Sequence, residues 1–117
     1  PAAAAIGSIL KIKPVLQIQG EKLDKFALAR SLPKAKETMK EAIRKDISTR
    51  FKGYAEAEEL CLSVAHTDSF KEAESFAEEL KESFPKIPFR FCDPLSLSIA
   101  CHIGPGALAV TCARYVK

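Results

Sequence analysis

The chain has 117 residues, of which 47% are apolar and 28% are charged, with 18 Lys and Arg against 15 Asp and Glu. This length and this apolar fraction are typical of one globular domain with a modest core, and they exclude a disordered chain. The net charge of +3 is small and evenly spread, which excludes the concentrated basic stripe that nucleic-acid binding requires.

The first segment, PAAAAIGSIL, predicts a short helix over residues 2–10 with Pro1 near its first turn. Because the chain begins with a helix in progress and without Met, we expect it to be a fragment that shares its function with a preceding part. No apolar run reaches the length of a membrane span, and the segment lacks the basic start of a secretion signal. We therefore expect a cytoplasmic protein without stable membrane insertion.

The next segment, KPVLQIQGEKLDKFALAR, has apolar and β-branched residues on both sides of Gly20 and predicts a β-hairpin. Ser31 follows as the expected N-cap of an amphipathic helix over residues 31–51 that ends at Gly53. Its apolar face repeats every four residues and consists of Ala35, Met39, Ile43 and Ile47.

Residues 60–92 predict a strand, a helix and a second strand. LCLSVAH is an apolar run of strand length, and Ser69 and Glu72 form a capping box that opens a helix over residues 69–84. Pro85 and Pro88 end this helix, and FRFC follows as a strand. A helix between two strands predicts that the strands are parallel neighbours.

The last part of the chain, LSLSIACHI and ALAVTCARY, predicts two antiparallel strands joined at Gly104, Pro105 and Gly106. Alternation places apolar residues on one side of this pair and small or mildly polar residues on the other. The small side comprises Ser96, Ser98, Ala100, His102, Ala107, Ala109, Thr111 and Ala113. Such a surface accepts either a closely packed helix, such as residues 2–10, or a ligand.

Together these elements predict an α/β, two-layer domain over residues 1–117. We expect a mixed six-stranded sheet with the helices mainly on one face. The four cysteines, Cys61, Cys92, Cys101 and Cys112, are too far apart for a C-x-x-C pair, and their neighbours are apolar. We therefore expect free, at least partly buried thiols and no metal site.

His102 is the first candidate for a binding residue because it lies just before the Gly-Pro-Gly turn, with only Ile103 between them. The N–H groups of Gly106 and Ala107 could lie free beside the imidazole and form an anion-binding corner. Arg30, at the end of the predicted hairpin, could bind a carboxylate or phosphate with two hydrogen bonds. An ordinary turn with a surface histidine and a solvated arginine remain open alternatives, and His66 fits a structural hydrogen bond better than a ligand.

The sequence contains no nucleophile elbow, P-loop or dinucleotide-binding fingerprint, and His102 has no acidic neighbour in the sequence. We therefore expect neither catalytic machinery nor a cofactor.

Several segments together resemble the C-terminal domain of the DegV family, the fatty-acid-binding proteins that serve bacterial fatty acid kinase. They are GSILKIKPVLQI, Gly20, Arg30 with Ser31, VAHTD and HIGPGALAV. The resemblance implies a two-domain protein whose N-terminal domain is missing from this chain, with a long-chain fatty acid held between the domains. It further implies a separate kinase catalytic subunit that converts the acid to an acyl phosphate for phospholipid metabolism.

The resemblance also implies which residues bind the ligand. His102, with Gly104 and Gly106 of its turn, would lie at the carboxylate, and Arg30 would be a second partner of this anionic group. The segment that contains Ala3, Ile6, Ile9 and Leu10 would lie along the acyl chain.

Two other functions remain open at this point. The dihydroxyacetone kinases have a related fold in which a histidine engages a small ketone, and the chain could also be a structural interaction domain. The apolar, Ala-rich residues around His102 favour a lipid, because a triose would need many more hydrogen-bonding side chains.

Overall fold

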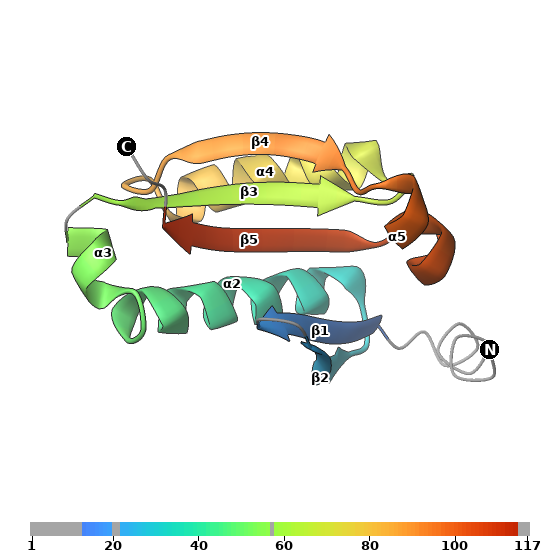
Figure 1. The fold of residues 1–117 in the computed structure, drawn as a ribbon, viewed down its shortest axis with the longest axis horizontal. Coiled ribbons are helices and arrows are strands. Elements are labelled where there is room, and N and C mark those ends of the chain that lie inside the picture. Colours follow the sequence, from blue (N-terminus) through green and yellow to red (C-terminus); the bar gives the residue numbers. More distant parts are fainter. Residues whose placement is uncertain (1–12, 20–21, 57, 115–117) are drawn as a thin grey trace. The chain divides into compact units, whose positions relative to one another are not determined.

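The structure, a computed structural model, describes residues 13–19, 22–56 and 58–114 (Figure 1). Strands and helices are mixed along the chain, which confirms the predicted α/β class. The helix expected over residues 2–10 lies outside the described residues. In chain order the elements are β1 (Lys13–Gln19), β2 (Lys22–Ala29), α2 (Leu32–Ser48), α3 (Lys52–Glu56), β3 (Leu60–His66), α4 (Phe70–Ser83), β4 (Phe89–Pro94), α5 (Leu97–Ile103) and β5 (Leu108–Arg114).

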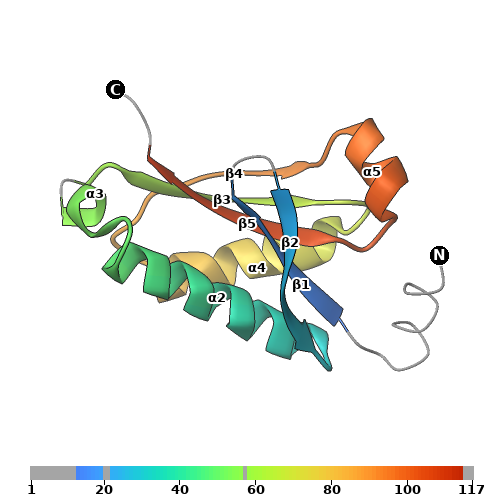
Figure 2. The same cartoon turned by 60° about the horizontal axis from the view of Figure 1, so that its bottom comes forward.

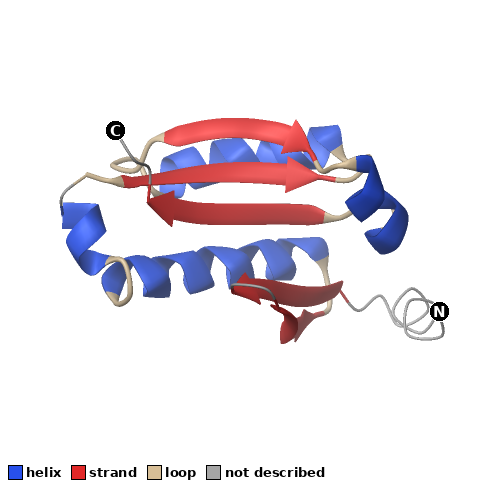
Figure 3. Ribbon diagram, viewed as in Figure 1, coloured by secondary structure: helices blue, strands red, loops and turns tan. Residues whose placement is uncertain are grey.

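The strands form two sheets, not the single six-stranded sheet that we expected. Five strands lie in the described residues, in one sheet of two strands and one of three (Figure 3). The chain divides into two compact units, residues 1–45 and 46–117, and each is described below by itself. Among the described residues, no helix is both long enough and apolar enough to cross a membrane.

The first unit contains the predicted hairpin. β1 and β2 pair antiparallel from Lys13 with Ala29 to Gln19 with Lys22. The register shifts where Val15 pairs with Ala27 and Leu16 pairs with Lys25, so β2 has one extra residue, Phe26, at this point. A small core joins the hairpin to α2 and contains Val15, Ala29 and Ala35, with Ala27 and Met39 packed against it.

Ser31 caps α2 as predicted. Its hydroxyl oxygen accepts a hydrogen bond of 3.3 Å from the N–H of Lys34, which otherwise has no partner in the first turn. The expected end of α2 at Gly53 is wrong, because α2 ends at Ser48 and Gly53 lies inside the short helix α3. The N–H of Phe51 donates to the carbonyl of Asp46, five residues back, whereas a continuing α-helix bonds four residues back.

The second unit is built on the sheet β4-β3-β5, with β3 in the centre. β3 and β4 are parallel with α4 between them in the chain, as predicted. α4 covers one face of this sheet (Figures 1 and 2). The buried residues of this unit include Leu60, Leu62, Val64, Ala73, Phe76, Ala77 and Leu80, each at most 4% exposed.

The segment 97–103 is a helix, α5, although its apolar alternation predicted a strand. β4 lies on one side of β3 and β5 lies on the other, and the parallel β4 ends where the antiparallel β5 begins. The chain must therefore cross the end of β3 between them, and α5 lies at this end of the sheet (Figure 1). β5 consequently pairs with β3, from His66 with Leu108 to Leu60 with Arg114, and not with residues 95–103.

The small-residue side predicted for β5 exists, and it continues onto β3. Ala65 pairs with Ala109 and Ser63 pairs with Thr111, so these small side chains alternate with the apolar pairs Val64–Val110 and Leu62–Cys112. His66 contacts Phe70 of α4, which places the even-numbered residues of β3 on the α4 face. The small residues therefore belong to the opposite face.

Candidate functional site

His102 is the next-to-last residue of α5, and Ile103 separates it from the turn into β5. Gly104 has φ +89° and Gly106 has φ +88°, in the region that favours glycine. The positive φ of Gly106 after Pro105 is typical of a type II turn. Gly104 adds a second left-handed residue, directly after α5, where helices commonly end.

Thr67, the first residue after β3, holds this turn through four hydrogen bonds. Its N–H donates to the carbonyl of Ala107 (3.0 Å), and its own carbonyl accepts from the N–H of Gly106 (2.6 Å). Its hydroxyl donates to the carbonyl of Gly104 (2.6 Å) and accepts from the N–H of Ala107 (2.9 Å). Thr67 is only 3% exposed, so the contact lies inside the protein. Sequence reasoning did not single out this residue.

The contacts of Thr67 correct one expectation about the turn. We expected the N–H groups of Gly106 and Ala107 to be free to bind an anion beside the imidazole. Both groups donate to Thr67. An anion bound at this end of the sheet must therefore be held by other donors.

His66 is buried and has the structural role that we expected. Its Nδ1 accepts a hydrogen bond of 3.1 Å from the N–H of Ser69, and its ring meets the Phe70 ring edge-on at 6.0 Å between centroids. Nε2 is buried without a hydrogen-bond partner among the described residues. The carbonyl of His66 accepts from the N–H of Leu95 at 2.7 Å, which ties the chain before α5 to the end of β3.

The contact between His66 and Ser69 replaces the capping box that the sequence predicted. Ser69 is the N-cap of α4, but its side chain makes no capping hydrogen bond. In a capping box, the N–H of Ser69 would donate a hydrogen bond to the carboxylate of Glu72. Here it donates to Nδ1 of His66 instead. The position of the cap was predicted correctly, whereas its hydrogen bond was not.

The remaining predicted ligand residues belong to the other unit or fall outside the described residues. Arg30 is exposed at the bend between β2 and α2, in the unit formed by residues 1–45, whereas His102 belongs to residues 46–117. The positions that we expected along the acyl chain, Ala3, Ile6, Ile9 and Leu10, are not among the described residues. The assignments of His102, Arg30, Gly104 and Gly106 to a ligand remain predictions.

α5 exposes several apolar side chains to solvent. Leu97 is 79% exposed, Ile99 42% and Ile103 47%, and Cys101 is exposed as well. A helix that leaves so much apolar surface in water presents a place where apolar atoms can bind. This surface shares its helix with His102.

The four cysteines are free, as expected, but they are not equally buried. Cys61, Cys92 and Cys112 are half-buried, whereas Cys101 is exposed, which corrects the expectation that all four are at least partly buried. Burial raises the pKa of Cys112 to about 11, so this group is a thiol at neutral pH and not a nucleophile. Within the described ranges, no three His, Cys, Asp or Glu side chains lie together as metal ligands.

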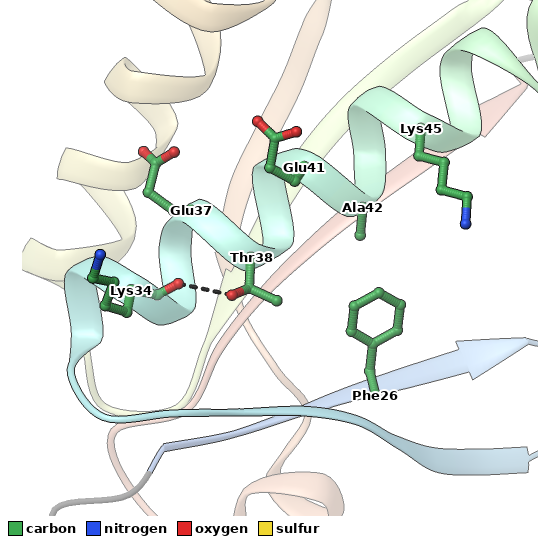
Figure 4. Close-up of a pocket in the computed structure, with 7 residues that line it drawn as sticks. All are labelled: Phe26, Lys34, Glu37, Thr38, Glu41, Ala42 and Lys45. Carbon is green, nitrogen blue, oxygen red and sulfur yellow. Dashed lines mark hydrogen bonds between the residues drawn. The ribbon is translucent and has the colours of Figure 1, made fainter.

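A shallow hollow of about 380 Å³ lies in the first unit (Figure 4). The ring of Phe26, at the extra residue of β2, points toward α2 across it, and none of the predicted ligand residues belongs to it. The hydroxyl of Thr38 donates within α2 to the carbonyl of Lys34 at 2.9 Å. The lining carries no net charge, because its two lysines balance its two glutamates. The residues of α2 that line the hollow are Lys34, Glu37, Thr38, Glu41, Ala42 and Lys45.

Residues 1–114 match a family model described as "Uncharacterised protein, DegV family". The chain is 33% identical over 109 residues to a DegV domain-containing protein of Clostridium acetobutylicum, which covers 93% of this chain and 35% of that protein. It is 31% identical over 109 residues to protein DegV of Bacillus subtilis, which covers 93% of this chain and 36% of that protein. The chain thus spans about a third of the length of these curated relatives.

Solved structures show the same fold. A stearic acid-binding protein from Eubacterium ventriosum superposes with a TM-score of 0.77 at 18% identity, over 94% of this chain and 36% of that one. The crystal structure of DegV from Bacillus subtilis, described as a fatty acid binding protein, superposes with a TM-score of 0.69 at 28% identity, over 97% of this chain and 38% of that one.

Proposed function

This chain belongs to the DegV family, and we propose that it binds a long-chain fatty acid as the C-terminal domain of a two-domain lipid-binding protein. The chain covers about a third of its relatives, so the rest of the protein would supply the other domain. Two structural relatives are described as binding fatty acid or stearic acid, which supports this ligand class.

The observation that carries this proposal is the exposed apolar surface of α5 on the same helix as His102. An acyl chain gains about 0.8 kcal/mol for each methylene that it buries, so a long chain needs an apolar surface and few polar groups. Leu97, Ile99 and Ile103 offer such a surface, and each is at least 42% exposed. A small polar ketone would gain little from it.

We assign the carboxylate to His102, which can donate a hydrogen bond to it, and to Arg30 as a second partner, which is a cation. Gly104 and Gly106 have no side chains, so the ligand can approach the turn closely. In this proposal Ala3, Ile6, Ile9 and Leu10 lie along the acyl chain.

We further propose that the protein holds the acid while a separate kinase subunit reacts with it. A carboxylate oxygen attacks the γ-phosphorus of ATP, the bond from that phosphorus to the bridging oxygen breaks, and acyl phosphate and ADP form. The binding protein performs no catalysis itself in this scheme. The product would enter bacterial phospholipid metabolism in the cytoplasm.

Native mass spectrometry of the full-length protein tests the binding step. We expect a co-purifying mass of a long-chain fatty acid, and after its removal we expect tighter binding of stearate than of dihydroxyacetone. His102→Ala should still carry a fatty acid, because the acyl chain supplies most of the affinity. Binding of dihydroxyacetone but not of stearate would overturn the proposal, as would a protein that binds neither.

A further inference from the structure

We propose that Thr67 is a positioning residue of this site, whose hydroxyl sets the place of the turn that follows His102. The inference rests on the proposed fatty-acid function and adds to it a residue that does not itself touch the ligand. Thr67 would determine how well the site distinguishes a carboxylate from an uncharged head group.

The hydroxyl of Thr67 lies between the two groups that would close the turn. In a closed β-turn, the carbonyl of the first residue accepts directly from the N–H of the fourth. Here the carbonyl of Gly104 accepts from Thr67 Oγ1 (2.6 Å), and the N–H of Ala107 donates to the same oxygen (2.9 Å). A hydroxyl can do this because it is both a donor and an acceptor. The hydroxyl oxygen of Thr67, the residue after β3, therefore sets the distance between Gly104 and Ala107 across the turn.

The segment around α5 depends on such bonds because its packing is weak. Its apolar side chains at positions 97, 99 and 103 are 79%, 42% and 47% exposed, so their burial holds the helix in place only in part. The chain before α5 is bonded through Leu95 to the carbonyl of His66, and the chain after it is bonded to Thr67. Two consecutive residues at the end of β3 thus hold both ends of the segment that carries His102.

Removal of the hydroxyl alone would disturb this arrangement. Thr67 is 3% exposed, so water does not readily replace the lost hydrogen bonds. The carbonyl of Gly104 and the N–H of Ala107 would have to bond each other or rotate toward solvent, and both changes move the turn. The two backbone hydrogen bonds of Thr67 would remain.

The test compares Thr67→Val, which keeps the shape but loses the hydroxyl, with Thr67→Ser, which keeps the hydroxyl. Binding of stearate and of octadecanol to the delipidated full-length protein is measured by calorimetry. We expect Thr67→Val to weaken stearate binding about tenfold, since one hydrogen bond to a charged group is misplaced. Octadecanol binding should stay within about twofold, because the acyl contacts are unchanged. Thr67→Ser should retain the parent preference for the acid.

A loss of affinity that is equal for the acid and the alcohol would mean that Thr67 only stabilises the fold, and it would overturn the inference. If Thr67→Val does not fold, Thr67→Ala decides, because it removes the same hydroxyl and keeps the two backbone hydrogen bonds of Thr67. Thr67→Ser remains the matched control. Thr67→Ala with the parent preference for the acid would also overturn the inference.

The same measurements separate this inference from the proposed function. A parent protein that does not bind stearate would refute the function, and the role of Thr67 would fall with it. A parent protein that prefers stearate to octadecanol, with an unchanged preference in Thr67→Val, would refute only the role of Thr67.

Discussion

Leu97 allows a test of the acyl contact that spares the fold. Burial of a whole leucine side chain contributes about 1.5–3 kcal/mol, and Leu97 is still 79% exposed. Folding therefore gains only a small part of this energy, and Leu97→Gln should lower the free energy of unfolding by less than about 1 kcal/mol. If an acyl chain covers Leu97, the complex gains most of the remaining burial energy of this side chain. Leu97→Gln would then lose about 1–2 kcal/mol of binding free energy, which corresponds to about 5- to 30-fold weaker binding.

Displacement of a fluorescent fatty acid by stearate measures this effect, and urea unfolding of the same samples measures stability. Leu16→Gln on β1 is the matched control, because Leu16 is also an exposed leucine, at 47%, and carries no assigned role in binding. We expect its affinity for stearate to equal that of the parent. Parent-like affinity in Leu97→Gln would refute the argument that α5 contacts the acyl chain.

Three further predictions follow from the structure. His102→Ala should slow acyl-phosphate formation with the kinase subunit about 10- to 100-fold while fatty acid still co-purifies, because it removes only a charge-assisted hydrogen bond; an unchanged rate would make His102 structural. Ser31→Ala should lower the free energy of unfolding by about 1 kcal/mol and Ser69→Ala by only a few tenths, because Ser31 alone of the two makes a side-chain cap; equal losses in urea unfolding would contradict this. At pH 8, Ellman's reagent should label the exposed Cys101 before Cys112, whose pKa is raised to about 11. The labelling rate of Cys112 should rise with pH up to that value, and simultaneous labelling of both cysteines at pH 8 would contradict this prediction.

The sequence predicted those elements whose apolar residues repeat with a clear period. α4 buries Ala73, Phe76 and Leu80 at the spacing of one helix face, and β3 is a continuous apolar run. Both patterns are local, so they could be recognised without knowledge of the neighbours. The parallel pairing of β3 and β4 followed from the helix between them.

The strand predicted over residues 95–103 failed for a reason that no local pattern contains. Apolar residues at every second position can form one face of a strand, but only if another layer covers that face. Leu97, Ile99 and Ile103 are exposed in this chain, so the alternation of apolar residues here does not mark a buried face of a strand. The position of β5 beside β3 decided the outcome, because it requires the chain to cross the end of the sheet.

The same crossing explains why two short segments far apart in the sequence are bonded to each other. Thr67 is separated from Gly104 by 37 residues and from Ala107 by 40, and the hydrogen bonds between them exist only because β3 ends where β5 begins. Taken alone, the turn predicted an anion-binding corner made of its own N–H groups. Because both N–H groups donate their hydrogen bonds to Thr67, a carboxylate at this place needs another donor. His102, two residues before Gly104, is a residue whose chemistry can supply that donor, which is why the proposed site depends on it and not on the turn.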